Sequence, residues 1–117
     1  MRYALHSTLV PGQEDAYERA HARIPADLEE SFDRFGIHDW TIWRSGVHLF
    51  HLVEADDLDE AMRALESDPA NVRWQRSIGV HLTPAAVDPQ TGRPGSPSAL
   101  PQVWRLADQL GEEAARV

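Results

Sequence analysis

The sequence predicts an α+β fold, a ferredoxin-like antiparallel sheet with helices on one face. Three patterns carry this prediction: a short N-terminal strand, a long amphipathic helix after it, and a two-stranded hairpin in the middle of the chain. The expected order is strand, long helix, strand, strand, helices, strand, as in a split βαβ arrangement. One apolar sheet face would stay uncovered, and two such sheets facing each other would form a dimeric α/β barrel.

A strand is expected over residues 2–9 and a long helix over residues 13–35. The helix is predicted because apolar residues recur at steps of three and four and form one stripe. Pro25 has no N–H to offer the carbonyl of His21, so a kink or break is expected there. Gly36 follows at the position of a typical C-terminal stop. The stripe consists of Ala16, Tyr17, Ala20, Ile24, Leu28, Phe32 and Phe35.

Residues 37–44 and 47–54 are predicted to form a hairpin joined by the two-residue turn Ser45-Gly46. Because side chains alternate along a strand, the hairpin residues divide between two faces. Both faces carry bulky apolar groups, so both are expected to be covered. In the first strand, one face has Trp40 and Ile42 and the other has Asp39, Thr41 and Trp43. In the second strand, one face has Val47, Leu49, His51 and Val53 and the other has His48, Phe50 and Leu52.

The second half of the chain is predicted to contain two helices, a loop and a last strand. The helices span residues 57–65 and 70–80, and residues 84–101 form a loop rich in proline, glycine and serine. Residues 102–106 look like the last strand. One domain therefore covers residues 1–106, and residues 107–117 form a helical or frayed tail.

The composition excludes several kinds of chemistry. The chain has no cysteine, and its 11 basic residues are all arginines. Thiolate nucleophiles, thiolate metal sites and disulfides are therefore excluded, as are Schiff bases and pyridoxal phosphate held by lysine. No phosphate-binding loop, nucleophile elbow or metal-ligand motif is present in the sequence either. We expect an enzyme without a cofactor or a metal.

The charge and the N-terminus suggest where the protein works. The formal net charge is −8, without a basic cluster, so we expect no nucleic-acid partner. Residues 1–6 contain no long apolar run, so neither a signal peptide nor a membrane-spanning helix is expected. The predicted location is cytoplasmic.

Tyr17 and His21 are the first candidates for a functional site. They are four residues apart on the helix stripe, so both side chains point towards the sheet. An imidazole can donate and accept a proton within one catalytic cycle, and a phenol beside it can bind a sugar hydroxyl. The plainer alternative is a boundary histidine bonded to the backbone, with Tyr17 as packing. Spacing alone favours this alternative.

Four tryptophans are many for a chain of 117 residues. Aromatic faces bind the C–H surfaces of sugars, so indoles near His21 would suit a carbohydrate pocket. Core packing is the better explanation for Trp43 and Trp104, whereas the two explanations are balanced for Trp40 and Trp74. His48 and His51 are three residues apart on a strand and point to opposite faces, so a shared metal site is not expected.

The sequence resembles the L-rhamnose mutarotase family over about residues 3–106. The segment Tyr17-Glu18-Arg19-Ala20-His21 is similar to the family's Tyr-x-x-x-His motif, and Asp27-Leu28 follows at a matching interval. The order and spacing of these short motifs make the resemblance specific. Further matches are Gly36-Ile37-His38-Asp39-Trp40, Ile42-Trp43, Val72-Arg73-Trp74 and Gln102-Val103-Trp104-Arg105-Leu106.

The resemblance implies a homodimeric α/β barrel that interconverts sugar anomers. It implies that His21 is the proton donor and that Tyr17, Trp40 and Trp74 contact the sugar. Trp40 replaces a tyrosine of the family, and Gln75 replaces the second tryptophan of a pair. These departures affect the walls of the sugar site and therefore concern the choice of sugar more than the reaction.

The expected function is the mutarotation of a free 6-deoxy aldose such as L-rhamnose, with L-fucose as the next candidate. His21 would protonate the ring oxygen while a second group or water removes the anomeric proton. Two alternatives belong to other classes. A cofactor-free monooxygenase on the same dimeric barrel would have an apolar pocket with few hydrogen bonds, whereas a non-catalytic sugar-binding module would bind sugar without exchanging its anomers. Gln75 beside Trp74 favours a sugar.

Overall fold

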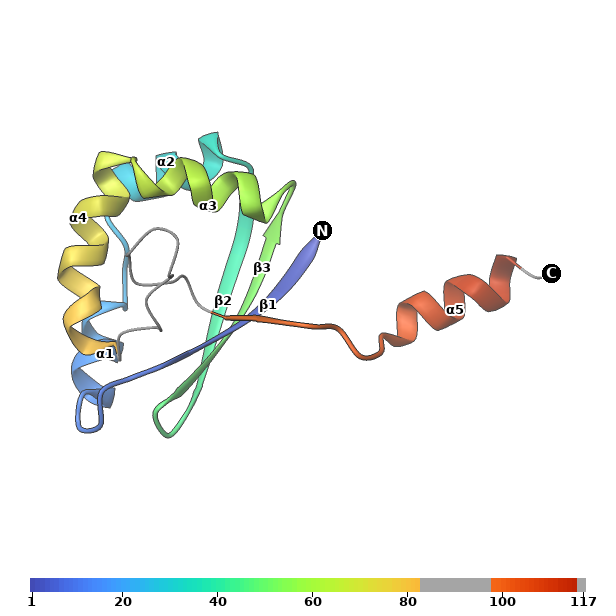
Figure 1. Ribbon diagram of the computed structural model, residues 1–117, viewed down its shortest axis with the longest axis horizontal. Helices are drawn as coiled ribbons and strands as arrows, with labels where there is room; N and C mark the ends of the chain where they lie inside the picture. The colour runs from blue at the N-terminus through green and yellow to red at the C-terminus, as the bar shows by residue number, and fades with distance from the viewer. Residues whose placement is uncertain (83–97, 116–117) are drawn as a thin grey trace, which may run out of the picture.

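Four antiparallel strands form one sheet in the order β2-β3-β1-β4, and four helices cover one of its faces (Figure 1). The computed structural model describes residues 1–82 and 98–115. This order and the one-sided cover are those of a ferredoxin-like α+β fold, as predicted. The elements are β1 (Arg2–Thr8), α1 (Glu14–Ala20), α2 (Ala26–Arg34), β2 (Ile37–Ser45), β3 (His48–Ala55), α3 (Leu58–Glu66), α4 (Pro69–Ile78), the 3-10 helix η1 (Gly79–His81), β4 (Ser98–Leu100) and α5 (Leu106–Ala115).

The core lies between the sheet and the helices, in two clusters of buried apolar side chains. The first joins the sheet to α3, and the second joins it to α1 and the end of α4. Their members come from alternate strand positions, because only one side of each strand faces the helices. The first cluster is Leu5, Ile37, Val53, Ala55, Leu58, Ala61 and Leu65, and the second is Leu9, Tyr17, Leu49 and Ile78.

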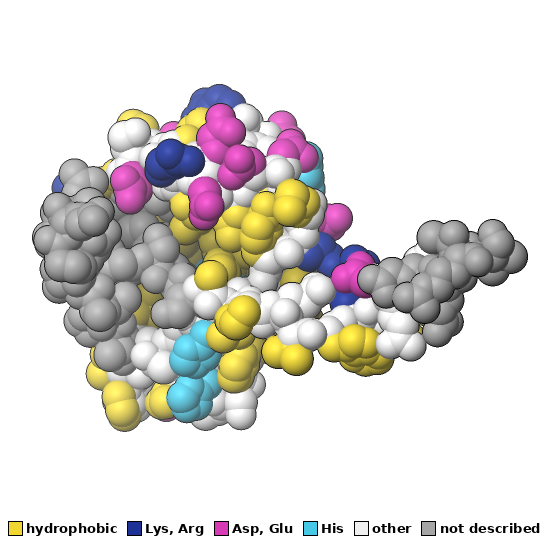
Figure 2. Space-filling view, turned by 45° about the vertical axis from the view of Figure 1, so that its right-hand side comes forward, with side chains coloured by type: hydrophobic (Ala, Val, Ile, Leu, Met, Phe, Trp, Pro, Cys, Tyr) yellow, Lys and Arg dark blue, Asp and Glu magenta, His cyan; other side chains and the backbone are white. Residues whose placement is uncertain are grey.

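The other sheet face, which we call the outer face, is open in this chain. Trp43 is 55% exposed, Phe50 41% and Leu100 42%. The strand register places Trp43 beside Phe50, and Phe50 beside His6, in one row across the sheet. Figure 2 shows histidine and hydrophobic side chains next to one another on this side of the molecule. The division of hairpin residues between two faces is therefore as predicted.

The helix predicted over residues 13–35 is broken into α1 and α2. His21 is the C-cap of α1, and its backbone N–H still bonds the Tyr17 carbonyl at 2.8 Å. Pro25 is the N-cap of α2, with an extended backbone. The break thus lies between His21 and Pro25, where it was predicted, because proline has no N–H to donate to the His21 carbonyl. Gly36 follows the C-cap of α2 and has a positive φ of 78°, which favours glycine at the end of a helix.

Three details of the sequence prediction are wrong. The hairpin loop is Gly46-Val47 rather than Ser45-Gly46, since Ser45 pairs with His48 and Gly46 supplies the positive φ. Residues 102–106 are not the last strand, because β4 is Ser98–Leu100 and Pro101 after it cannot donate to a ladder. Trp43 and Trp104 are not core residues, being 55% and 65% exposed.

A buried carboxylate ties α2 to α4. Asp68, the N-cap of α4, accepts hydrogen bonds from the Ser31 hydroxyl at 2.7 Å and from the backbone N–H of Asn71 at 3.2 Å. Arg34 forms an ion pair with it at 3.1 Å. The Ser31 hydrogen bond is the main reason why the pKa of Asp68 is lowered. This contact fixes the position of α4 relative to α2.

The predicted loop 84–101 lies outside the described residues up to residue 97, and its last residues belong to β4. The segment after β4 leads away from the sheet to α5 (Figure 1). In the part of the chain that is described, no helix is long and apolar enough to cross a membrane.

Candidate active site

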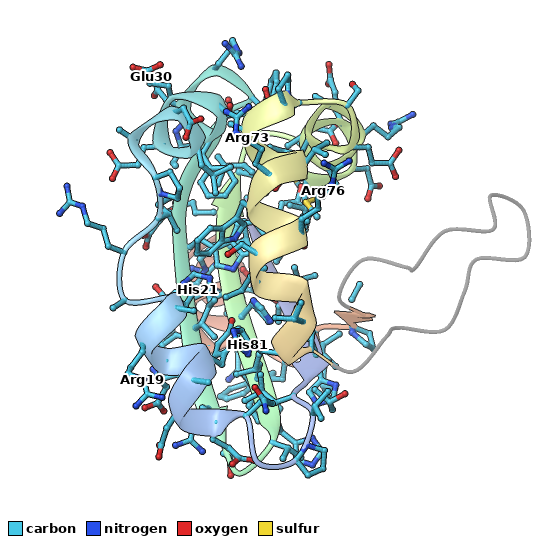
Figure 3. The ribbon with its side chains drawn as sticks, turned by 90° about the vertical axis from the view of Figure 1, so that its left-hand side faces the viewer. Arg19, His21, Glu30, Arg73, Arg76 and His81 are labelled. Atoms are coloured by element: carbon cyan, nitrogen blue, oxygen red, sulfur yellow. The ribbon has the colours of Figure 1, made fainter. Side chains whose placement is uncertain are left out.

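His21 lies at the end of α1, between this helix and α4, on the helix-covered side of the sheet (Figure 3). Its ring contacts the Tyr17 ring, with 5.4 Å between centroids, and meets the Trp74 ring edge to face at 5.1 Å. Among the described residues these are aromatic contacts only, and the ring nitrogens of His21 have no hydrogen-bond partner. The imidazole is thus placed among aromatic rings with its nitrogens available to a ligand.

Tyr17 is the buried member of this group, with 6% of its surface exposed. It packs with Leu49 and Ile78 in the second core cluster. Burial raises the pKa of the Tyr17 phenol to about 12. Tyr17 is therefore a neutral phenol, able to donate a hydrogen bond, at every pH at which an ordinary enzyme works.

Trp40 forms the second aromatic part of the site and is oriented by His51. The Trp40 indole stacks on Phe32 with 5.7 Å between centroids. Its Nε1 donates a hydrogen bond to His51 Nδ1 at 3.1 Å. On the other side of the imidazole, His51 Nε2 lies 2.9 Å from the hydroxyl oxygen of Ser7. Residues from β1, β2 and β3 thus form one chain of hydrogen bonds across the sheet.

His51 and Ser7 are site neighbours that sequence reasoning missed. His51 is 7% exposed, on the helix-covered face of β3. The pKa of His51 is lowered from 6.5 to about 4, mainly by burial and also by the charges of His21 and His6. The available signal was the alternation of β3, which places His51 on the same face as Leu49 and Val53. The partners of His51 could not be read from sequence, since they depend on register.

Gln75 is the one predicted site residue that the structure leaves apart from the others. Its side chain is exposed on α4, and its amide bonds Asn71 one turn earlier at 3.4 Å. Arg73, its neighbour, forms an ion pair with Asp27 of α2. His21 contacts both Tyr17 and Trp74, and Trp40 contacts His51, which lies close enough to His21 for the charge of His21 to affect its pKa. The site therefore has aromatic walls and two imidazoles.

One cavity of the molecule lies apart from this site. A cavity of about 380 Å³ lies between α2, the start of β2 and α3, and Arg34, His38, Asp56 and Glu60 are among its lining residues. None of the predicted site residues lines it. In residues 1–82 and 98–115 no group of three or more histidines and carboxylates could hold a metal ion. His48 and His51 point to opposite faces, as expected.

Solved structures with the same fold include enzymes with different reactions. The L-rhamnose mutarotase from Formosa agariphila is 18% identical, with a TM-score of 0.70 over 91% of this chain and 98% of that one. The tetracenomycin F2 cyclase from Streptomyces glaucescens, a type II polyketide cyclase, is 22% identical, with a TM-score of 0.59 over 90% and 97%. SnoaB, a cofactor-independent oxygenase from Streptomyces nogalater, is 15% identical, with a TM-score of 0.55 over 90% and 94%.

At these identities the structural likeness establishes the fold, and the family is established by sequence. No curated protein matches the chain in a direct search. The sequence model of L-rhamnose mutarotase, however, matches residues 2–106. This match includes every residue of the site described above. The chain belongs to the L-rhamnose mutarotase family and is a sugar-isomerising enzyme.

Proposed function

We propose that the protein exchanges the anomers of a free 6-deoxy aldose, with L-rhamnose as the first substrate to test and His21 as the proton donor. The observation that supports this most directly is the position of His21 beside Tyr17 and Trp74, with ring nitrogens that no other described residue binds. The aromatic rings would bind the C–H faces of the sugar, while His21 and the Tyr17 phenol would bind its oxygens. The membership of the mutarotase family supports the same assignment.

The proposed reaction needs two proton movements and no cofactor. Protonated His21 gives its proton to the ring oxygen, while a base or water takes the proton of the anomeric hydroxyl. The bond between C1 and the ring oxygen then breaks, and an open-chain aldehyde forms. Rotation about C1–C2 and the reverse steps give the other anomer. One or two positioned acid–base groups contribute roughly 10²–10⁴-fold, which is a sufficient acceleration for a reaction that already proceeds in water.

Exchange NMR tests this proposal directly. Saturation of one anomer of L-rhamnose or L-fucose should transfer to the other in the presence of the protein, and His21→Ala should reduce the transfer rate by at least about 100-fold. His38→Ala is the matched control, because His38 is exposed and bound to Asp56 at 2.8 Å, away from the site. Equal rates for His21→Ala and wild type would refute the role of His21.

We also propose that the protein is a homodimer formed through the outer face. The exposed row of Trp43 and Phe50 supports this, since an apolar sheet face of this kind is stabilised by a partner. Two copies packed face to face would form the barrel expected for the family. Sedimentation should give twice the chain mass. A monomer at micromolar concentration would contradict the proposal.

A second candidate function is favoured by one observation. The indole N–H of Trp40 is bonded within the protein, so Trp40 offers a ligand only its apolar face. A site with such walls would also suit a polycyclic aromatic compound, as in a cofactor-free oxygenase of the kind represented by SnoaB. Oxygen uptake with a polycyclic phenol, and no exchange of sugar anomers, would favour this candidate over the mutarotase. Non-catalytic sugar binding would show as binding without either reaction.

A further inference from the structure

The hydrogen bonds from Trp40 through His51 to Ser7 fix where their protons lie. An indole N–H can only donate, so His51 Nδ1, 3.1 Å from Trp40 Nε1, must be the acceptor. A neutral imidazole with an unprotonated Nδ1 carries its proton on Nε2. That proton is therefore donated to the Ser7 hydroxyl oxygen, 2.9 Å away.

A charged His51 does not fit the same geometry. Protonation of Nδ1 would place two N–H donors opposite each other at 3.1 Å, without an acceptor between them. The 7% exposure of His51 would also leave the charge poorly solvated. Geometry and burial thus both favour a neutral ring with one defined tautomer.

The strand register places Ser7 on the sheet face that carries the site. Ser7 is half-buried on β1 and pairs in the sheet with Leu49. Leu49 in turn packs with Tyr17, whose ring contacts His21. Ser7 therefore lies on the helix-covered face, in the part of the sheet below Tyr17 and His21.

We propose that Ser7 is a substrate-binding residue whose hydroxyl is oriented as a hydrogen-bond donor by His51 and Trp40. Because the Ser7 oxygen accepts from His51, its own hydrogen is left to donate to an oxygen of the ligand. This inference rests on the proposed function, since a sugar offers such acceptor oxygens. His51 is a positioning residue, which acts on the ligand through Ser7 and through the orientation of Trp40.

The tautomer of His51 can be measured without any substrate. Long-range ¹H–¹⁵N correlation NMR of the full chain distinguishes a protonated from an unprotonated ring nitrogen, and His51→Gln assigns the signals. Between pH 6 and 8 we expect a neutral ring with its proton on Nε2. A proton on Nδ1, or a charged ring in this range, would overturn the proposal.

The role of the Ser7 hydroxyl is tested by exchange kinetics on L-rhamnose. Ser7→Ala should raise KM about tenfold, the usual effect of one lost hydrogen bond, and change kcat much less. Ser7→Thr keeps a hydroxyl and should stay within about twofold of wild type. Ser77→Ala is the matched control, since it removes an exposed hydroxyl from α4. Circular dichroism would verify that each variant is folded.

A double-mutant cycle tests whether His51 acts through Ser7. His51→Phe should raise KM at least as much as Ser7→Ala, because it also removes the partner of Trp40, and the combination should raise KM no further than His51→Phe alone. His51→Gln retains one donor and one acceptor and should recover part of the loss. Unchanged KM in Ser7→Ala, with anomer exchange intact in wild type, would overturn the role of Ser7 alone. Absence of exchange in wild type would instead overturn the mutarotase proposal, and Ser7 as a sugar ligand with it.

Discussion

The two faces of the sheet carry similar residues in different environments. On β3, His51 and Leu49 point to the helices, whereas His48 and Phe50 point to the outer face. His51 is 7% exposed and held between Trp40 and Ser7, while His48 is exposed and bonds His6 at 3.0 Å. The comparison teaches that histidine and aromatic content alone do not locate a site. Burial and fixed partners distinguish the two imidazoles.

The largest difference between the two faces is expected when one aspartate is placed on each of them. Leu49→Asp buries an unpaired carboxylate where the native side chain is 1% exposed, and should lower the free energy of unfolding by about 4 kcal/mol or unfold the chain. Phe50→Asp lies on the outer face and should retain the fold while it abolishes self-association. Circular dichroism with urea and sedimentation measure the two effects. Comparable unfolding by both variants would contradict the distinction between the faces.

A smaller effect is expected from acid. The pKa of His51 is about 4 in the folded chain and 6.5 ordinarily, so the unfolded chain binds a proton first as the pH falls. The stabilisation by neutral His51 is present above pH 6.5 and is lost between about 6.5 and 4. After allowance for solvent screening, the loss is about 2 kcal/mol.

Urea unfolding of wild type and His51→Gln at several pH values isolates this contribution. The difference between the two free energies of unfolding should change between about pH 6.5 and 4, because only the wild type has His51. The remaining titratable groups contribute equally to both proteins. His48→Gln, on the outer face, should follow the wild-type pH dependence. A constant difference between wild type and His51→Gln would refute the prediction.

The smallest effect concerns the hydrogen bond of the Trp40 indole, compared with Trp43, whose indole has no hydrogen bond among the described residues. Trp40→Phe removes the donor to His51 and should cost about 1 kcal/mol of stability. Trp43→Phe, on the outer face, should stay within about 0.5 kcal/mol in the monomer. Both variants are made in a chain that also carries Phe50→Asp, so that each protein is monomeric. Their free energies of unfolding are then measured with urea at one pH. Equal costs for the two variants would show that the Trp40–His51 bond contributes nothing.

The sequence predicted the division of the hairpin between two faces because strand alternation is a local property. It also predicted the break near Pro25, because the missing N–H is local too. The hairpin loop was displaced by one residue, and β4 was placed too late in the chain. Both errors concern which residues pair with a neighbouring strand. This pairing depends on the partner strand and cannot be read from one segment of the sequence alone.

The site was predicted in part for the same reason. Tyr17 and His21 are four residues apart, so their contact follows from helix geometry. The role of His51 depends on Ser7, 44 residues away, and on Trp40, 11 residues away. No periodicity links these three residues, and only the register of β1, β2 and β3 brings them together. Gln75 was predicted because it stands where the family has the second tryptophan of a pair, but adjacent residues of a helix point to different sides.

The hydrogen bond of Ser31 and the ion pair of Arg34 with Asp68 have a consequence for how the substrate of this protein can change in evolution. They hold α4 against α2 with residues that are not among the aromatic walls of the site. Substitutions at Trp40 or Trp74 can therefore change the shape offered to a ligand while the frame that carries them stays in place. In a fold arranged in this way, a substitution in the site walls loses only its own local contacts, and the packing of α4 on α2 is kept.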